Sequence, residues 1–195
     1  EEGRSSILMQ IASGTSFTSL SSTSFCGTLD LVLNVDNDPL NLIVFTIKSN
    51  GDFFEKHREV QVIRMNNGLC NDPDIDKWNL CPFSLLKVLI VGTNCLHFVG
   101  QLELVGFSEL ERIEIGSNSF MAEENCAFVV KDCPSLLCVS IGDDCFVHCK
   151  RTVFESEYYG LESRIDLPHL SSVSLGDNVF RGDEFKNNVL IMQSS

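Results

Sequence analysis

The stretch Cys-Pro-Ser-Leu-Leu-Cys-Val-Ser-Ile-Gly-Asp-Asp-Cys-Phe, residues 133–146, decides the fold, because copies of it lie on both sides. The copies, from the clearest to the faintest, are residues 107–120, 167–180, 86–96, 42–53 and 9–17. Repetition at a period of a few tens of residues indicates supersecondary units that stack on one another, because one unit cannot bury its own apolar face.

The apolar positions of each copy read Leu-x-x-hydrophobic-x-hydrophobic-Gly-x-x-x-Phe. The central alternation has the period of two that a strand requires, so each copy predicts one short strand. Gly116, Gly142 and Gly176 follow it directly, where we expect a sharp turn that uses positive φ. The aromatic position four residues later should fold back and stack on its equivalents, making an apolar spine; it holds Phe120, Phe146 and Phe180, with Leu96 as a substitute.

A second apolar alternation precedes some copies at a fixed offset. Leu102 and Leu104 stand at offsets of −13 and −11 from Ile115, and Phe128 and Val130 stand at the same offsets from Ile141. Each coil therefore has two walls, with a base period of about 24 to 26 residues, which is typical of stacked repeats. The predicted fold class is a β-rich, right-handed solenoid of parallel strands with little helix, and a compact β-sandwich is the alternative.

The runs at residues 107–120 and 133–146 resemble the irregular leucine-rich repeats of large repeat proteins from microbial eukaryotes and of some bacterial surface proteins. The resemblance covers roughly residues 83–180. It departs from the usual pattern in lacking the Asn/Cys turn after the strand, and it is loose in the N-terminal third. It implies a curved solenoid that binds other macromolecules, usually proteins, without naming a partner.

We expect one elongated domain over residues 1–195. Residues 1–33 should form an atypical N-terminal coil or cap, and residues 34–195 should hold the repeats with their insertions. Within the second coil, residues 60–65 read as a return strand. The insertion loops are expected at residues 66–79, 121–125 and 155–164. The chain begins without Met and ends without an obvious polar cap, so we expect a fragment of a longer chain.

The formal net charge of −13 argues against a nucleic-acid backbone or an anionic membrane as partner, since both require a basic face. A protein with a basic surface fits this charge better. No apolar run reaches the 18 or more residues of a membrane span. The 9 cysteines are an odd number and fall mostly at repeat positions, which predicts reduced thiols in the core. With no glycosylation sequon, an intracellular location is favoured, and the cell surface is the alternative.

Neither a metal site, a cofactor site nor a catalytic site is predicted. Asp72, Asp74 and Asp76 resemble the start of a calcium loop, but Lys77 and Phe83 stand where such a loop needs Gly and Glu. The cluster Cys145, His148 and Cys149, with Cys133 and Cys138 nearby, has the ligand types of zinc without its spacing.

We therefore predict a non-catalytic module or scaffold that binds a protein. The alternatives are a parallel β-helix enzyme acting on carbohydrate and a structural subunit of a large assembly. The enzyme would need acids aligned on adjacent coils, and Glu114 has Ser140 and Ser174 at its equivalent positions. The predicted contact residues lie beside the strand hydrophobics and in the insertion loops: Glu111, Arg112, Glu114, Asp72, Asp74, Trp78, Tyr158 and Tyr159.

Overall fold

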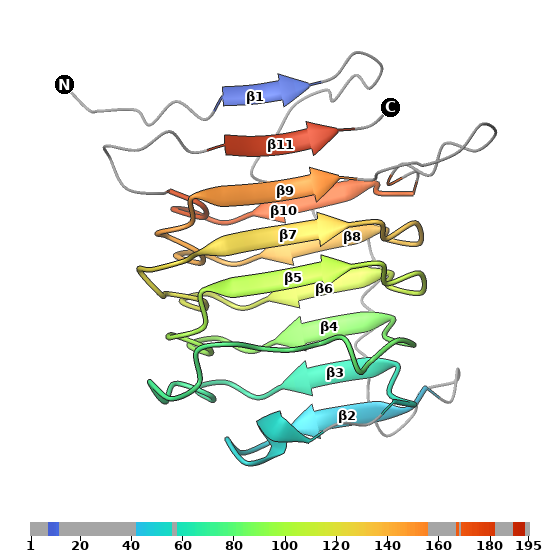
Figure 1. The fold of residues 1–195 in the computed structure, drawn as a ribbon, viewed down its shortest axis with the longest axis vertical. Helices are drawn as coiled ribbons and strands as arrows, with labels where there is room; N and C mark the ends of the chain where they lie inside the picture. Colours follow the sequence, from blue (N-terminus) through green and yellow to red (C-terminus); the bar gives the residue numbers. More distant parts are fainter. Residues whose placement is uncertain are drawn as a thin grey trace.

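The computed structural model describes residues 8–11, 42–55, 58–155, 167, 169–181 and 189–193. Its parallel strands stack as a β-solenoid of about four turns, with essentially no helix (Figure 1). A single 3-10 turn, η1 (Asp52–Phe54), lies among the described residues at one end of the stack. The predicted class of fold is thus confirmed.

Two parallel sheets form the walls of the coil. Sheet B runs in the order β10-β8-β6-β4-β3-β2. Its strands are β2 (Val44–Ile47), β3 (Val62–Met65), β4 (Val88–Val91), β6 (Arg112–Ile115), β8 (Cys138–Ile141) and β10 (Ser172–Leu175). Neighbouring strands are related by one repeat, so Ile115 pairs with Val91 on one side and with Ile141 on the other.

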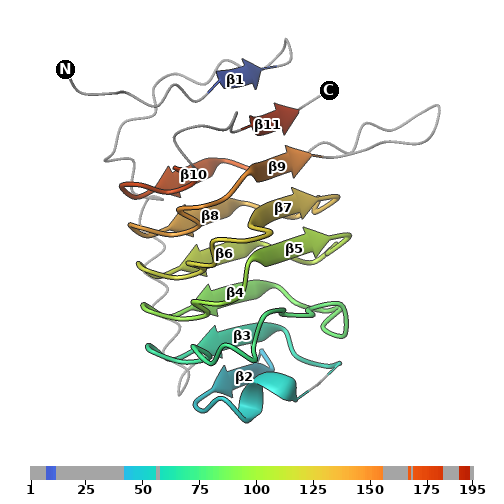
Figure 2. The same cartoon turned by 60° about the vertical axis from the view of Figure 1, so that its left-hand side comes forward.

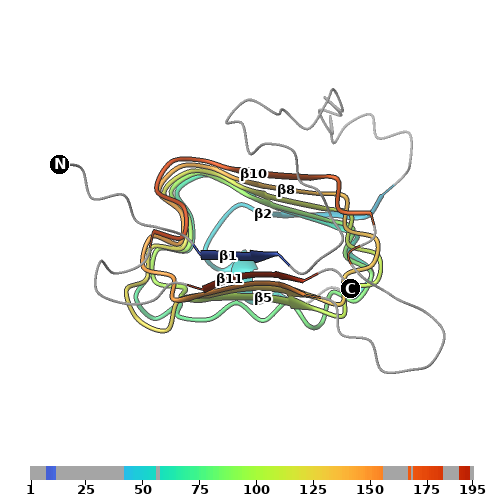
Figure 3. The ribbon, with the colours of Figure 1, turned by 90° about the horizontal axis from the view of Figure 1, so that it is seen from above.

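Sheet A runs in the order β1-β11-β9-β7-β5. Its strands are β1 (Leu8–Ile11), β5 (Gln101–Val105), β7 (Ala127–Lys131), β9 (Arg151–Glu155) and β11 (Val189–Gln193). Seen along the stack, sheets A and B face each other across a common interior (Figure 3). The second wall predicted from Leu102, Leu104, Phe128 and Val130 is sheet A.

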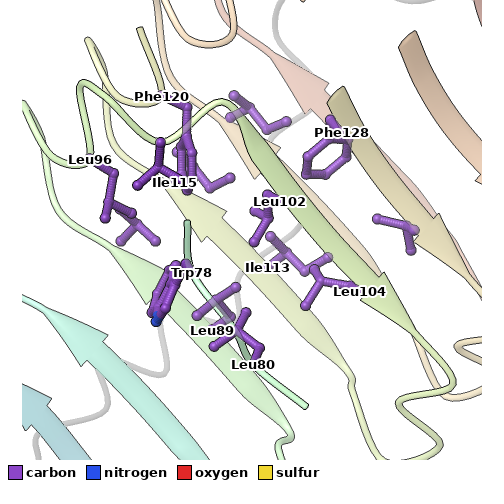
Figure 4. Packing of buried hydrophobic residues seen from close by; sticks show 14 of the residues in the cluster. Trp78, Leu80, Leu89, Leu96, Leu102, Leu104, Ile113, Ile115, Phe120 and Phe128 are labelled. Carbon is purple, nitrogen blue, oxygen red and sulfur yellow. The ribbon is translucent and has the colours of Figure 1, made fainter. Parts of the chain in front are cut away.

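The interior is filled by the alternating apolar residues of both sheets (Figure 4). Ile113, Ile115 and Leu110 point inward from β6 and the turn before it, and all are buried. The predicted spine is present: the rings of Phe120 and Phe146 stack with their centroids 4.5 Å apart. Phe180 continues the spine at 5.5 Å from Phe146. Apolar burial of this kind is the main term that holds a stack of coils together.

The glycine that follows β4, β6, β8 and β10 is required for a different reason from the one predicted. Among the described glycines, only Gly68 and Gly106 have a positive φ angle. A Cβ added to Gly116 would instead lie 2.6 Å from the backbone nitrogen of Thr93 in the preceding coil, and one on Gly142 would lie 2.7 Å from that of Ser117. Such contacts are shorter than any carbon tolerates, so close stacking of the coils excludes a side chain here.

Of the eleven described non-glycine residues with positive φ, eight fall two or four residues after one of these glycines. The first set is Asn94, Asn118, Asp144 and Asn178, and the second is Leu96, Phe120, Phe146 and Phe180. Asn and Asp tolerate this conformation better than most residues, which explains their recurrence in the turn. The turn thus does contain an Asn-type position, contrary to the expectation from the sequence.

The second coil differs from the prediction. The segment at residues 60–65 contains β3, which pairs with β2 and β4 in sheet B and is not a return strand. Met65 therefore divides the interval between Ile47 and Val91 into steps of 18 and 26. Lys77 makes a parallel bridge to Gln101 of β5, so the end of the expected loop 66–79 belongs to the wall of sheet A.

The N-terminal strand also lies elsewhere than expected. β1 pairs with β11, at the end of the stack opposite β2 (Figures 1 and 2). It is not a first coil placed against the second. Residues 12–41, which include Phe17 of the faint copy, lie outside the described residues.

Of the other two predicted insertions, residues 156–164 lie outside the described residues, and residues 121–125 lie between β6 and β7. Leu175 follows Phe154 at an offset of 21, where Ile115 follows Leu104 at an offset of 11. The turn from Gly116 to Ala127 is two positions longer than that from Gly92 to Gln101. The insertion at residues 121–125 therefore falls in a connection between the walls, and the strands on both sides keep their register.

Candidate functional site: the outer face of sheet B

The outer face of sheet B carries the charged residues that the sequence singled out on the strands. Along β6, Ile113 and Ile115 point inward, so Arg112 and Glu114 point outward. Glu111 joins them because the strand starts irregularly: the backbone N–H groups of Glu111 and Arg112 both donate to the carbonyl of Lys87, at 2.8 and 3.1 Å. Three adjacent charged side chains of one coil therefore share this face.

Arg112 and Glu114 form an ion pair, and each side chain is 30% exposed. At this exposure the pair contributes little to stability. The Nε of Arg112 is buried and has no hydrogen-bond partner among the described residues. The pair holds two opposite charges at fixed places on the face, which suits recognition of a polar partner better than it suits stabilisation.

The composition of the face changes from coil to coil. In the row of Glu114, the register places Ile90 on one side and Ser140 and then Ser174 on the other. Lys87 and Arg64 lie toward the β2 end, and Leu137, 45% exposed, lies beside β8. Despite the acidity of the whole chain, basic and acidic side chains are thus about equal on this face.

A shallow hollow of about 330 Å³ lies where the strands end on this face. It is lined by Ile90, Glu114 and Ser140 and by the turn residues Asn67 and Thr93. Gly92 and Gly116 also line it, and a Cβ on either would meet the preceding coil, at 2.8 Å from the nitrogen of Asn67 and 2.6 Å from that of Thr93. The hollow therefore spans four neighbouring coils, from the turn after β3 to β8.

The acidic charge gathers on the edge of the solenoid formed by the turns that leave sheet B, which we call the glycine edge. In the described turns its acidic residues are Asp52, Glu55, Asp72, Asp74, Asp76, Glu123, Glu124, Asp143, Asp144 and Asp177, against the basic residues Lys48, Lys150 and Arg181. The hollow borders this edge at Asn67 and Thr93. The opposite edge, with Arg58 and Lys131 against Glu59, Glu109 and Asp132, is close to neutral.

Asp72 and Asp74 are exposed on the glycine edge, as predicted. Asp72 shapes its own turn: its Oδ1 accepts the N–H of Asp74 at 3.0 Å, and its carbonyl accepts the N–H of Ile75 at 2.9 Å. Ile75 is buried and anchors the turn to the core. The two carboxylates are therefore held at the surface on a fixed turn.

Trp78 does not belong to this surface, and the prediction that it is exposed for a partner is corrected. Its side chain is buried among the core residues (Figure 4). Its ring centroid lies 5.5 Å from that of Phe53. The signal was in the sequence, because Trp78 and Leu80 stand at the same offsets from Val91 as Leu102 and Leu104 from Ile115. Trp78 is a wall residue of sheet A. Tyr158 and Tyr159 lie outside the described residues.

The described cysteines are free thiols, and all are buried except Cys81. Several are hydrogen-bonded: the Sγ of Cys95 donates to the carbonyl of Asn66 at 3.1 Å, and that of Cys145 donates to the carbonyl of Gly116 at 3.2 Å. Burial raises the pKa of Cys70 to about 12 and of Cys145 to about 11. Thiols held in the protonated form are poor nucleophiles and poor metal ligands.

Within the described ranges, no three His, Cys, Asp or Glu side chains are grouped so as to hold a metal ion. None of the helical structure in that part of the chain has the length and apolar character needed to cross a membrane. Comparison with known proteins gave no match to a family model, to a curated protein or to a solved structure.

Proposed function

We propose that the chain is a non-catalytic protein-binding module that uses the outer face of sheet B and the adjoining glycine edge. The hollow beside Glu114 carries the proposal. It offers a recess for one side chain, a carboxylate at its wall, and the Arg112–Glu114 pair beside it. Small recesses flanked by fixed polar groups are typical of the anchor points in protein interfaces.

The distribution of charge supports a partner with a basic surface. The glycine edge is strongly acidic and the opposite edge is close to neutral. A basic protein would be steered toward the acidic edge and would then meet the mixed charges of the sheet B face, where position and sign provide specificity. We also propose that the coils are irregular leucine-rich repeats and that the free, buried thiols correspond to an intracellular setting.

The register gives less support to a carbohydrate-active enzyme. Ile90 and Ser140 are the neighbours of Glu114 along its row, so this row holds no second acid beside Glu114 in the described coils. Acid and base catalysis on a sugar would need two carboxyl groups roughly 5 to 9 Å apart. The binding module is therefore our choice over the enzyme.

The proposal is tested by capturing partners with the purified chain and with matched charge reversals. The double variant Glu111→Lys/Glu114→Lys changes the sheet B face, and Glu103→Lys places the same charge on the exposed outer side of β5 in sheet A. We expect a specific partner to be lost with the first variant and retained with the second. The captured partner should then bind the parent chain at least tenfold more tightly than the double variant in calorimetry.

A second variant tests the hollow itself. Ser140 is exposed at its wall, so Ser140→Phe fills the recess without disturbing the core. Loss of the same partner with an unchanged melting temperature would support the hollow as the anchor point. Equal capture by the parent chain and all three variants would contradict the proposal.

A further inference from the structure

Two buried thiols, those of Cys126 and Cys149, meet between neighbouring coils. Cys126 comes directly before β7 and Cys149 two residues before β9, and these two strands are paired in register. The N–H of Lys150 donates to the carbonyl of Cys126 at 3.3 Å, which joins the two turns. The two thiols are hydrogen-bonded to each other, and their residues are 3% and 1% exposed. Two thiols in contact need little backbone movement to form a disulfide.

The sulfur of Cys149 has more polar neighbours than packing requires. As a thiol it donates to the carbonyl of Arg151 at 3.3 Å. Its hydrogen-bond donors are the backbone N–H groups of Phe128 and Arg151, the hydroxyl of Thr152 and the thiol of Cys126. Hydrogen bonds donated to a charged group favour its charged form, so these donors stabilise a thiolate at Cys149.

Apolar side chains would fill the core as well as Cys149 and Thr152 do. Val99 stands three residues after its spine position, as Cys149 does after its own, and it is buried. Thr152 is 3% exposed and pairs in register with Phe128, which pairs with Leu102. The hydroxyl thus occupies an inward position that apolar side chains hold in the two preceding coils. A buried hydroxyl needs a hydrogen-bond partner, and the sulfur of Cys149 supplies it.

The hydrogen bond between the two thiols makes them chemically unlike. It is the main cause that lowers the pKa of Cys149, and the same bond, followed by burial, raises the pKa of Cys126. Cys70 and Cys95 are a second pair of buried thiols in neighbouring coils, but burial raises the pKa of both, to about 12 for Cys70. Cys149 is therefore the thiol that ionises first, while Cys126 keeps its proton.

The pair lies one residue below the surface. Asn125, before Cys126, and Lys150, after Cys149, are both exposed. Lys150 also places a positive charge beside the pair, which favours thiolate over thiol. Opening of these two turns alone would admit a small, uncharged oxidant such as a hydroperoxide, without separating the two sheets.

We infer that Cys126 and Cys149 are a redox-active dithiol, which a hydroperoxide oxidises to a disulfide between neighbouring coils. With hydrogen peroxide, the Cys149 thiolate attacks one oxygen and the O–O bond breaks. The other oxygen leaves with the electron pair and takes up a proton, giving water and a sulfenic acid on Cys149. The Cys126 sulfur then attacks the Cys149 sulfur, the S–O bond breaks, and the released hydroxide takes the Cys126 proton as a second water. The two sulfurs lose two electrons and the peroxide gains them.

The test treats the purified chain with an equimolar dose of hydrogen peroxide and maps its peptides without reduction. Mass spectrometry should show Cys126 and Cys149 in one cross-linked species that lacks two hydrogens, and dithiothreitol should restore both thiols. Cys70 and Cys95, the control pair, should react at least about tenfold more slowly. The oxidation rate at Cys149 should be half-maximal below about pH 8.5, the ordinary pKa of a cysteine thiol. Equal rates for the two pairs, or a half-maximal rate at or above that pH, would overturn the inference.

Two variants separate the roles of the sulfurs. Cys126→Ala leaves the sulfenic acid of Cys149 without a thiol to attack it, so dimedone should label Cys149 after peroxide treatment. Cys149→Val copies the buried Val99 of an earlier coil, so it should keep the melting temperature of the parent chain. Cys126 should then remain a thiol at the same dose of peroxide. The inference fails if dimedone does not label the first variant, or if Cys126 of the second is oxidised at the parent rate.

Discussion

The coils in the middle of the stack and those at its ends are built from the same repeat but are held differently. In the middle, β6 lies between β4 and β8, and its glycine, spine ring and turn side chains all meet a neighbouring coil on both sides. At one end, Lys48 replaces the glycine and η1 replaces a strand of sheet A. At the other, β10 keeps the full repeat but lacks a neighbour beyond it in the described chain.

The difference shows that the repeat pattern predicts full burial of its apolar positions only where a coil has a neighbour on both sides. Ile115 and Ile141 are 4% and 2% exposed, whereas Leu175, at the same position, is half-buried. Stability in such a stack is close to a sum over coils and the interfaces between them, so terminal coils receive one interface term instead of two. Substitutions at matched positions in the two regions should therefore differ in their effect on stability.

The largest effect is expected in the aromatic spine. Phe146 is fully buried, stacks on Phe120 at 4.5 Å and lies 5.1 Å from Phe128. Phe146→Ala should lower the free energy of unfolding by about 3–5 kcal/mol in chemical denaturation. Phe180→Ala, at the last coil, should cost at least about 1 kcal/mol less because its site can relax toward solvent. Equal losses at the two positions would mean that the last coil is as enclosed as the middle.

The glycine line should give the next largest effect. Gly142→Ala places a methyl group 2.7 Å from the backbone nitrogen of Ser117 and should cost about 1–3 kcal/mol through forced separation of two coils. The control is Gly51→Ala in the first turn, where the new Cβ would meet only the Oγ of Ser49 at 3.6 Å. That variant should change the free energy of unfolding by less than about 0.5 kcal/mol. Thermal melts of both variants show whether the loss of stability comes from the close approach of two coils at Gly142 or from replacing any glycine by alanine.

A smaller effect is expected from the row of buried donors behind the spine. The Oγ of Ser119 donates to the carbonyl of Gly92 at 3.0 Å and accepts the N–H of Cys95 at 3.2 Å. Ser119→Ala leaves both groups buried without a partner and should cost about 1–2 kcal/mol.

Ser119→Cys is the matched rescue, because Cys95 and Cys145 already donate from the equivalent positions. It should recover more than half of the loss. The row ends at Val179, which has no donor, so the last coil lacks this bond altogether. If the alanine and cysteine variants were equally destabilised, the hydrogen bond would not be the cause.

The smallest effect is a pH dependence at the β2 end. The N–H groups of Lys48 and Ser49 donate to the Asp52 carboxylate at 2.8 and 2.9 Å, and the bond from Lys48 is the main cause that lowers the pKa of Asp52. Because its pKa is lowered in the folded state, the Asp52 carboxylate stabilises the fold at pH values above the ordinary pKa of an aspartate. This stabilisation is lost as the pH falls through the lowered pKa. The Asp52 carboxyl resonance should titrate below that of a model peptide. Asp52→Asn should remove the acid-dependent opening of this turn, and no change in the exchange of the Lys48 amide would contradict the account.

The sequence was sufficient for the middle of the stack and insufficient for its ends. Alternation and the Gly-x-x-x-Phe spacing located β4, β6, β8 and β10, the spine and the wall made by β5 and β7, because each of these carries the full repeat. β3 was misread because its coil is shorter than the others and has Asn66 where the pattern has glycine. The place of β1 could not be foreseen, since its pairing with β11 joins the two ends of the chain.

The candidate site was predictable in part. The alternation alone places Arg112 and Glu114 on the outer face. The outward direction of Glu111 depends on an irregular strand start, which the Leu-x-x-hydrophobic spacing from Leu110 to Ile113 indicates and simple alternation does not. Trp78 was assigned to an exposed loop because the residues before it are rich in Asp and Asn. Its offset from Val91 nevertheless equals that of Leu102 from Ile115, which marks it as a residue of the sheet A wall. The hollow itself is lined by residues of four neighbouring coils, which a single repeat does not show.

Amide hydrogen exchange at matched positions tests most directly whether sheet B ends openly at β10. The N–H groups of Val139 and Ile141 point toward β10, whereas those of Val173 and Leu175 point away from β8 to the unpaired edge. Residue-resolved exchange should therefore show strong protection at Val139 and Ile141 and exchange at least a hundredfold faster at Val173 and Leu175. Equal protection at the four amides would show that another strand already covers β10, and would contradict the account.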